Sequence, residues 1–193
     1  GYGVAISAYH RDVKIYDNVI NDCGVGIQLK SFSDSEIFNN SITSTQTGSK
    51  GIMAHVTNVN NVNVYKNYID VKTHGLYFVS LNQGLLEENF QVAVSENNFI
   101  STAAITFSRA KGVTFNNNES ASRLQVVNCS KVKVLSNKIE PSNGHGVAIS
   151  GESFNIEVIN NNITVPLDTN FDCVYIANST DINEVLNENN TCN

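Results

Sequence analysis

The chain has 193 residues, of which 41% are hydrophobic, enough for one domain with a sizeable core. Only 16% are charged and the formal net charge is -6, which argues against nucleic acid as a partner and fits a neutral or sugar-like ligand better. No hydrophobic run approaches the roughly 20 residues of a membrane span, so membrane insertion is not expected. We predict one domain over residues 1–193, which we interpret as a mature or excised segment of a longer protein because the sequence begins inside a repeat.

One eight-residue pattern recurs along most of the chain. In Val62 to Ile69 it reads apolar-x-apolar-x-x-Asn-x-apolar. Further copies span 13–20, 35–42, 92–99, 132–139 and 156–163, with a weaker copy at 113–120 and a decayed one at 182–189. Their asparagines are Asn18, Asn40, Asn67, Asn97, Asn118, Asn137, Asn161 and, in the decayed copy, Asn187. A period of roughly 20 to 50 residues indicates stacked structural units.

A second pattern, usually Gly followed by apolar-x-apolar, precedes each copy of the first. It occurs at 3–6, 24–27, 51–54, 75–78, 104–107, 123–126, 146–149 and 173–176. Alternation over such short pieces favours strands with one buried face, and the segments between them are too short for crossover helices. The sequence therefore predicts an all-β parallel β-helix of about eight coils, with like strands about 4.8 Å apart in three short parallel sheets.

In this arrangement the first strands supply two inward columns. The first is predicted to contain Val4, Val25, Ile52, Leu76, Ile105, Leu124, Val147 and Val174. The second is predicted to contain Ile6, Ile27, Ala54, Phe78, Phe107, Val126, Ile149 and Ile176. The repeated Asn falls at a bend between the second and third strands, where a buried amide bonds the turn and the next coil in a ladder. We assign this Asn no catalytic role.

These repeats resemble the right-handed parallel β-helices of the pectate-lyase-like superfamily, which includes pectin-degrading enzymes, polysaccharide lyases and epimerases, and phage tailspike depolymerases. The resemblance covers essentially the whole chain and implies a polysaccharide or cell-surface glycan as partner. It also implies a location outside the cell, on a virion or on a cell surface. No cofactor is predicted, because neither clustered carboxylates for calcium nor a His/Cys set for zinc is visible.

Interruptions of the repeat are the candidate functional positions, since loops on a rigid scaffold tend to carry function. The longest, Ser80 to Gln91, contains Glu87 and Glu88. We predict that these two glutamates and His55 are catalytic, because paired carboxylates suit glycoside hydrolysis. The predicted substrate-binding residues are Tyr77, Arg109, Gln28, Gln125 and Tyr175. The alternative is that the glutamates are solvated loop charges, His55 a surface residue and Arg109 a turn residue.

A second constellation lies just before the first strands, where Lys50, His74, Ala103, Ser122, His145 and Asp172 are predicted to form one column. Ser122, His145 and Asp172 match the residue types of a nucleophile, a base and an orienting group. Since no oxyanion hole is evident, we favour a structural hydrogen bond between Asp172 and His145.

Three further features follow from the repeat. Outward apolar positions form a predicted stripe: Tyr16, Phe38, Tyr65, Leu135, Ile159 and Val185. A missing segment, a long loop or sister chains of a trimer would cover it, the trimer being what the resemblance to tailspikes implies; the alternative is a stripe that is simply exposed. Lys14 with Glu36 and Lys133 with Glu157 are predicted cross-strand pairs. Cys173 and Cys192 lie just under one coil apart, close enough for a disulfide at the last coil.

The sequence thus favours a carbohydrate-binding and depolymerising β-helix, acting if it is an enzyme as a glycoside hydrolase or polysaccharide lyase. The alternative is a non-catalytic structural or adhesive shaft, in which the interruptions are irregular turns.

Overall fold

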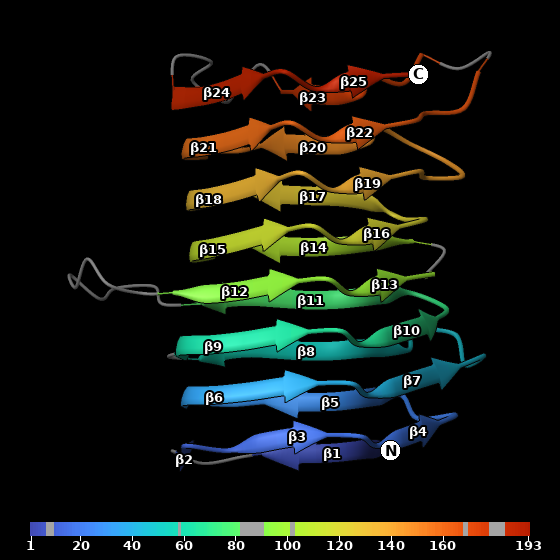
Figure 1. Cartoon of the computed structure of the whole chain (residues 1–193), viewed down its shortest axis with the longest axis vertical. Coiled ribbons are helices and arrows are strands. Elements are labelled where there is room, and N and C mark those ends of the chain that lie inside the picture. Colours follow the sequence, from blue (N-terminus) through green and yellow to red (C-terminus); the bar gives the residue numbers. More distant parts are fainter. Residues whose placement is uncertain (7–9, 58, 82–90, 101–102, 168–169, 178–183) are drawn as a thin grey trace.

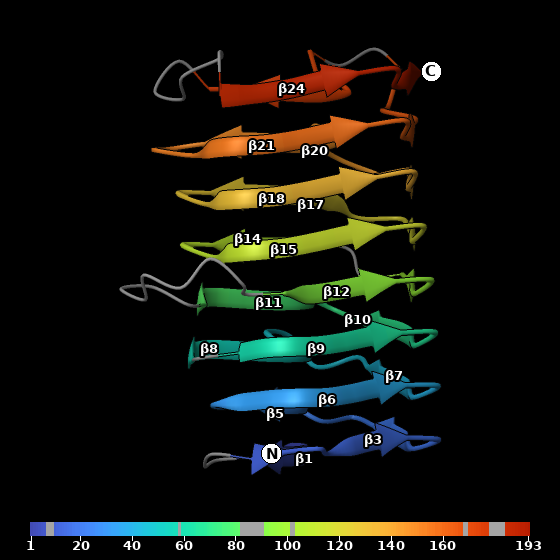
Figure 2. The same cartoon turned by 60° about the vertical axis from the view of Figure 1, so that its left-hand side comes forward.

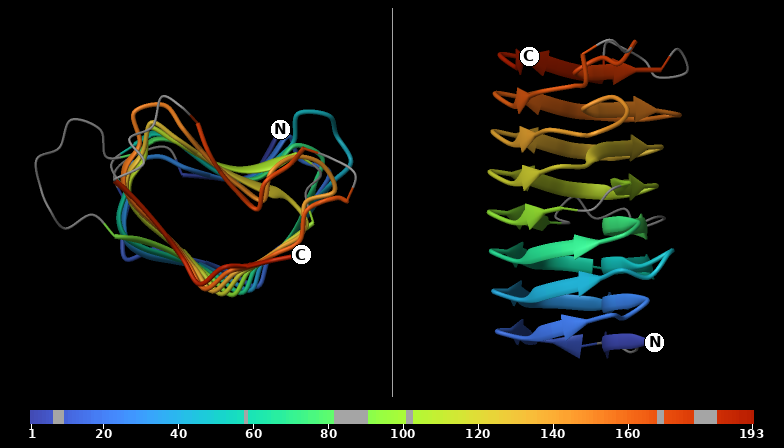
Figure 3. Two further views of the ribbon diagram at one scale, coloured as in Figure 1. Left: turned by 90° about the horizontal axis from the view of Figure 1, so that it is seen from above. Right: turned by 90° about the vertical axis from the view of Figure 1, so that its right-hand side faces the viewer.

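The computed structural model describes residues 1–6, 10–57, 59–81, 91–100, 103–167, 170–177 and 184–193. These residues form a right-handed parallel β-helix of stacked coils, as predicted (Figure 1). Within the described ranges, no helix has the length and hydropathy needed to cross a membrane. Viewed along the long axis, the coils superpose on a common outline (Figure 3).

Three parallel sheets run the length of the coil. The first contains β1 (Tyr2–Ile6), β5 (Val25–Leu29), β8 (Lys50–Thr57), β11 (His74–Leu81), β14 (Ala104–Ser108), β17 (Arg123–Val127), β20 (Val147–Ser150) and β23 (Val174–Ile176). The second contains β2 (His10–Arg11), β3 (Lys14–Tyr16), β6 (Phe32–Phe38), β9 (Val59–Tyr65), β12 (Val92–Ser95), β15 (Lys111–Asn116), β18 (Ser130–Leu135), β21 (Phe154–Ile159) and β24 (Val185–Glu188). The third contains β4 (Val19–Asn21), β7 (Ser41–Ser44), β10 (Tyr68–Val71), β13 (Asn98–Phe99), β16 (Glu119–Ser120), β19 (Lys138–Ile139), β22 (Asn162–Ile163) and β25 (Thr191–Cys192). Figure 2 shows the strands of the second sheet stacked coil upon coil.

The inward columns of the first sheet match the prediction except in the second coil. Ile27 is paired with Val4 and Ile52, and Leu29 with Ile6 and Ala54. Val25 therefore does not belong to the first column, nor Ile27 to the second. The error arose because 24–27 and 26–29 both fit the Gly-apolar-x-apolar pattern, and a parallel sheet pairs by register along the whole strand rather than by the first glycine.

The asparagine ladder is present at the bend between the second and third sheets. Nδ2 of Asn67 donates to Oδ1 of Asn97 over 2.9 Å, and the backbone amide of Asn67 donates to the same oxygen over 3.0 Å. Nδ2 also reaches the carbonyl oxygens of Tyr65 and, one coil back, Ile37. The same ladder runs through Asn18, Asn40, Asn67, Asn97, Asn118, Asn137, Asn161 and Asn190.

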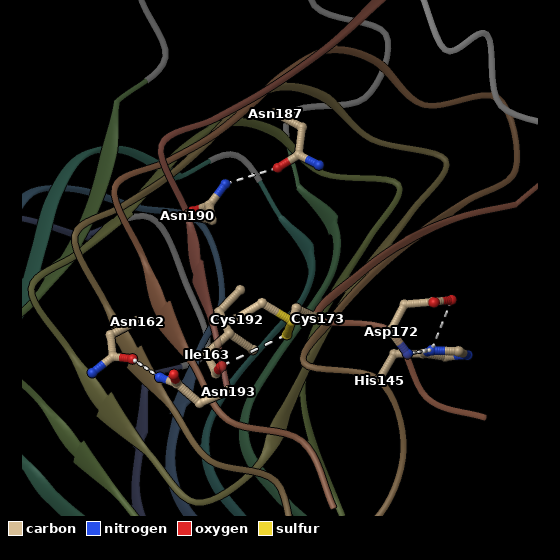
Figure 4. The surroundings of a disulfide bond; sticks show 9 residues. All are labelled: His145, Asn162, Ile163, Asp172, Cys173, Asn187, Asn190, Cys192 and Asn193. Atoms are coloured by element: carbon tan, nitrogen blue, oxygen red, sulfur yellow. Dashed lines mark hydrogen bonds and ion pairs between the residues drawn. A yellow bond between two sulfur atoms is a disulfide. The ribbon is translucent and has the colours of Figure 1, made fainter. Parts of the chain in front are cut away.

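The last ladder position was wrongly predicted. Asn190 accepts from Nδ2 of Asn161 over 2.9 Å, whereas Asn187 lies outside the ladder and accepts a 2.7 Å bond from Nδ2 of Asn190. Figure 4 shows this pair beside the last coil. The decayed copy of the pattern is shifted by three residues relative to the backbone bend, so the residue at the bend is the later asparagine.

Every ladder asparagine follows a residue in the left-handed conformation. These residues, with φ between 52° and 58°, are Asp17, Asn39, Lys66, Glu96, Asn117, Ser136, Asn160 and Asn189. Left-handed backbone lets the chain turn within one residue, at a steric cost for any side chain with a Cβ. The ladder asparagine comes next in the chain, and its side-chain amide donates to the carbonyl oxygen of the residue before the turn, as Asn67 does to Tyr65.

The third-sheet isoleucines explain the glycines that enter the first sheet. A Cβ on Gly51 would lie 2.4 Å from Cγ2 of Ile69 and 2.5 Å from the carbonyl oxygen of Gly75. Ile42 and Ile163 occupy the corresponding space at Gly26 and Gly146. Because an isoleucine of the third sheet fills this space, the neighbouring residue that leads into the first sheet must be a glycine.

The outward stripe of the second sheet is confirmed in part. Tyr16, Phe38 and Tyr65 stack with ring centroids 5.0 Å apart at both steps and planes within 7°. The same column then continues through Ser95, Asn116, Leu135, Ile159 and Glu188. Val185 is paired with Ile156 and packs against the core, so its assignment to the stripe was wrong.

The predicted surface pairs and disulfide are present. Nζ of Lys14 lies 2.9 Å from Oε2 of Glu36, and Nζ of Lys133 lies 2.9 Å from Oε1 of Glu157. Cys173 is bonded to Cys192, with Cα atoms 5.8 Å apart, and so joins the residue just before β23 to β25 in the last coil (Figure 4).

Candidate functional site

The outward face of the first sheet carries a central column of side chains, one from each coil, which begins at Ala5 opposite Gln28. Register places Gln28 opposite Met53, Met53 opposite Tyr77, and Tyr77 opposite Thr106. The column continues through Gln125, Ala148 and Tyr175. Four of the predicted substrate-binding residues therefore share one line: Gln28, Tyr77, Gln125 and Tyr175.

Side chains in this column present both flat and hydrogen-bonding groups. Gln28, Tyr77 and Gln125 are half-buried and Tyr175 is 38% exposed. Oγ1 of Thr106 donates to Oε1 of Gln125 over 3.3 Å, which holds the Gln125 amide against the preceding coil. The result is a half-covered strip rather than a closed pocket.

The remaining predicted site residues lie toward the end of these strands. His55 is exposed and is paired with Val79, so it stands two positions beyond the Met53–Tyr77 pair. Arg109 is also exposed, directly follows β14, and has φ 50°. Arg109 is therefore a turn residue at the edge of the strip, and His55 does not lie directly opposite Tyr77. Glu87 and Glu88 lie outside the described residues.

At the start of the strands, the predicted column of turn residues is wrong at one step, the step from His74 to Ala103. His74 is paired with Lys50 and Ala104, and Ala104 is paired with Arg123. An irregularity of β11 between His74 and Tyr77 shifts the register relative to β14. Ala104 and Arg123 consequently follow His74 in the line, while Ser122, His145 and Asp172 keep the register predicted for them relative to one another.

Two residues of this line, Lys50 and His74, lie against Tyr77. Nζ of Lys50 lies 5.4 Å from the centroid of the Tyr77 ring, and the His74 ring meets that ring edge-on at 4.8 Å. Burial lowers the pKa of His74 below its ordinary value, and the positive charges of Lys50 and Arg123 lower it further. His74 is thus kept neutral near neutral pH by a partly apolar, positively charged setting.

Ser122, His145 and Asp172 do not form a nucleophilic triad. Ser122 is 1% exposed, which removes it from the surface on which a substrate would lie. The backbone amide of Asp172 donates to Nδ1 of His145 over 2.8 Å, so Nδ1 is the acceptor and the imidazole proton is on Nε2. The predicted structural hydrogen bond between these two residues is confirmed, and Figure 4 shows it.

His145 also occupies one face of Tyr175. The two rings stack at 4.3 Å with planes 12° apart, and Phe171 meets His145 edge-on at 5.5 Å. A ligand could therefore contact only the part of the Tyr175 ring that His145 leaves uncovered.

No group of three or more His, Cys, Asp or Glu residues that would hold a metal occurs among the described residues. The free cysteines do not add one: Cys23 is half-buried and Cys129 is buried, and burial raises the pKa of the Cys129 thiol.

Sequence reasoning missed Arg123 as a site residue. The pattern had identified it only as the first residue of a strand, in the place that glycine takes elsewhere. A charged residue at that position was the available signal.

Searches against protein-family models, curated proteins and solved structures find no match to this chain.

Proposed function

We propose that the protein binds an extended glycan along the outward strip of the first sheet, from Gln28 to Tyr175. The observation that carries this proposal is a column in which an amide or a tyrosine side chain returns at every second coil, at Gln28, Tyr77, Gln125 and Tyr175. Sugar rings stack on aromatic faces, and their hydroxyl groups pair with planar amides, so such a column provides matched contacts along a polymer. The resemblance of the repeat to the pectate-lyase-like superfamily supports the same ligand class.

Cleavage of the glycan by Glu87 or Glu88, with His55 assisting, is the catalytic part of the proposal. Paired carboxylates act in glycoside hydrolysis as general acid and base or as nucleophile. A double Glu87→Gln and Glu88→Gln variant is expected to bind glycan and release no product. Full depolymerising activity in that variant would remove the catalytic part and leave the binding part intact.

The binding part is tested by soaking and glycan-array measurements on matched tyrosine variants. Tyr77→Ala is expected to weaken binding, whereas Tyr65→Ala, on the second sheet, is expected to leave it unchanged. Loss of binding with Tyr65→Ala alone would place the ligand on the other face and overturn the assignment.

A second candidate is a structural or adhesive shaft, as the uninterrupted asparagine ladder favours. In the stripe of Tyr16, Phe38 and Tyr65 the ring faces are engaged with one another, so a protein surface fits the exposed edges better than a sugar ring does. We propose that a homotrimer buries this stripe, outside the cell or on a virion; the disulfide is consistent with an oxidising environment. Absence of any bound glycan, together with a trimer that Tyr16→Ser and Tyr65→Ser dissociate, would favour the shaft.

A further inference from the structure

The outward face of the second sheet carries an acidic hollow and a basic one. Asp34 and Glu36 line a hollow of about 290 Å³ over β3, β6 and β9, together with Lys14, which forms an ion pair with Glu36. Lys131 and Lys133 line another hollow, of about 380 Å³, over β12, β15 and β18. Opposite charges therefore lie at two separate places on one face.

The charges on this face follow an order that is reversed about its middle coil. Register gives the column beside the aromatic stripe as Lys14, Glu36, Asn63, Ala93, Thr114, Lys133, Glu157 and Leu186. Ala93 belongs to β12, and two coils from it stand Glu36 on one side and Lys133 on the other. Three coils from it stand Lys14 and Glu157. Each of these charges therefore has its opposite at the same distance from Ala93.

Asp34 and Lys131 extend this order to the turn before the column. Asp34 lies two residues before Glu36, and Lys131 lies two residues before Lys133. Both are exposed, with φ of 50° and 54°. Neither forms an ion pair within the described ranges, and Asp34 accepts only a 2.9 Å hydrogen bond from Nδ2 of Asn61 there. Both charges are therefore available to a partner.

A two-fold axis parallel to β12 and passing over Ala93 matches this order. Rotation by 180° about that axis lays a second copy face to face on the first, with the coils in reverse order and each column opposite itself. Glu36 of one copy then faces Lys133 of the other, and Lys14 faces Glu157. Because such a contact is isologous, each of these pairs forms twice.

The charges select this register over its neighbours. An axis moved by half a coil in one direction sets Glu36 against Glu157, and an axis moved by half a coil in the other sets Lys14 against Lys133. An axis along the length of the coil sets every residue of the column against its own copy, including Glu36 against Glu36. Like charges placed together suppress the wrong arrangement of an interface, so the antiparallel register centred on Ala93 is favoured.

The aromatic stripe is buried by the same contact. Counted from Ser95 in β12, Phe38 faces Leu135 and Tyr16 faces Ile159. Tyr16 is 50% exposed in the single chain. About seven coils spaced by about 4.8 Å, each with about five residues of about 3.3 Å, give roughly 550 Å² per copy. The total of roughly 1,100 Å² exceeds the roughly 1,000 Å² that a specific interface needs.

We propose that the outward face of the second sheet binds a second copy of this chain in an antiparallel two-fold dimer centred on Ala93. In this dimer Asp34 faces Lys131, beside the pairs named above. The first sheet lies behind the second in Figure 1, so both glycan strips stay open and run in opposite directions. The inference is independent of glycan binding, and it assigns the stripe to a dimer in place of the trimer considered for the shaft.

Sedimentation velocity of the chain over a concentration series at low salt measures this association. A species of twice the 21.1 kDa of the chain is expected, and added salt is expected to weaken it. Lys131→Glu and Asp34→Lys are each expected to weaken dimerisation about tenfold or more, because each places like charges together twice. Lys138→Glu reverses a charge on the third sheet and is expected to leave dimerisation unchanged, while thermal melting verifies that all variants fold.

A mixture of the two single variants tests which residues face each other. A Lys131→Glu chain laid on an Asp34→Lys chain has opposite charges at both contacts. An equimolar mixture is therefore expected to recover the dimer that each variant alone has lost. A defect within either chain would not be repaired by the other chain.

The other outcomes overturn the proposal. A monomer at every concentration would overturn the dimer, and a trimer would overturn it and support the shaft. A dimer that neither Lys131→Glu nor Asp34→Lys weakens, or a mixture that fails to recover it, would place the contact on another face. None of these outcomes bears on the first-sheet strip, which Tyr77→Ala tests separately.

Discussion

Nδ2 of Asn97 donates to Oδ1 of Asn118 over 3.0 Å, and the backbone amide of Asn97 donates to the same oxygen over 3.0 Å. The two residues are 2% and 1% exposed, so water does not replace a lost partner. Each ladder asparagine thus completes the hydrogen bonding of the coil before it, and this dependence joins neighbouring coils.

Asn118→Ala is expected to lower the free energy of unfolding by about 2 to 4 kcal/mol, because it removes the acceptor of the Asn97 backbone amide and the amide donor to the carbonyl oxygens of Val94 and Asn116. Urea denaturation measures the loss. Asn63→Ala, at an exposed strand position, is the control and should change stability by less than about 0.5 kcal/mol. Similar small losses in both variants would show that the ladder does not stabilise the fold.

The ladder and the sheets were predictable from sequence because the backbone repeats. Residues at the same place in the pattern come to lie one coil apart, which is why Lys14 with Glu36 and Lys133 with Glu157 were paired correctly. Prediction failed where the pattern fits the chain in two ways, as at Val25 and Ile27, or where an irregular strand shifts the pairing, as at His74.

The candidate site was less predictable than the fold for a related reason. Outward residues are not constrained by packing. The pattern therefore predicts which face of the sheet they lie on, but not which side chains they contact. Gln28, Tyr77, Gln125 and Tyr175 were correctly placed on one face, whereas the contact of Lys50 with Tyr77 depends on side-chain positions that no repeat specifies.

Ser136→Gly is expected to raise the free energy of unfolding by about 0.5 to 1 kcal/mol, since Ser136 has φ 54° and glycine takes this conformation without steric cost. The matched control is Ser130→Gly in β18, which should lower stability by about 0.5 to 1 kcal/mol because glycine weakens a strand. Urea denaturation of both variants checks the difference in sign. A loss of stability in both would contradict the steric argument.

The disulfide between Cys173 and Cys192 closes a loop with a sequence separation of 19. Replacing both cysteines by alanine is expected to lower the free energy of unfolding by about 3 kcal/mol, mainly because the unfolded chain gains conformational entropy without the crosslink. Cys23→Ala is the control, because Cys23 is free, and should stay within about 0.5 kcal/mol. If a reducing agent destabilised the double variant as much as the native chain, the effect would not come from this bond.

The pKa of His74 is expected to lie below the ordinary value for histidine, because burial lowers it and the positive charges of Lys50 and Arg123 lower it further. The unfolded chain therefore binds more protons than the folded one between the two pKa values, so stability should rise with pH in that window and fall as pH drops through the ordinary value. Titration of the His74 ring by NMR measures the shift. Lys50→Gln and Arg123→Gln should each raise the pKa of His74, while Lys133→Gln should not. A pKa at or above the ordinary value in the native chain would contradict the positively charged setting, and His74→Gln should remove this part of the pH dependence of stability.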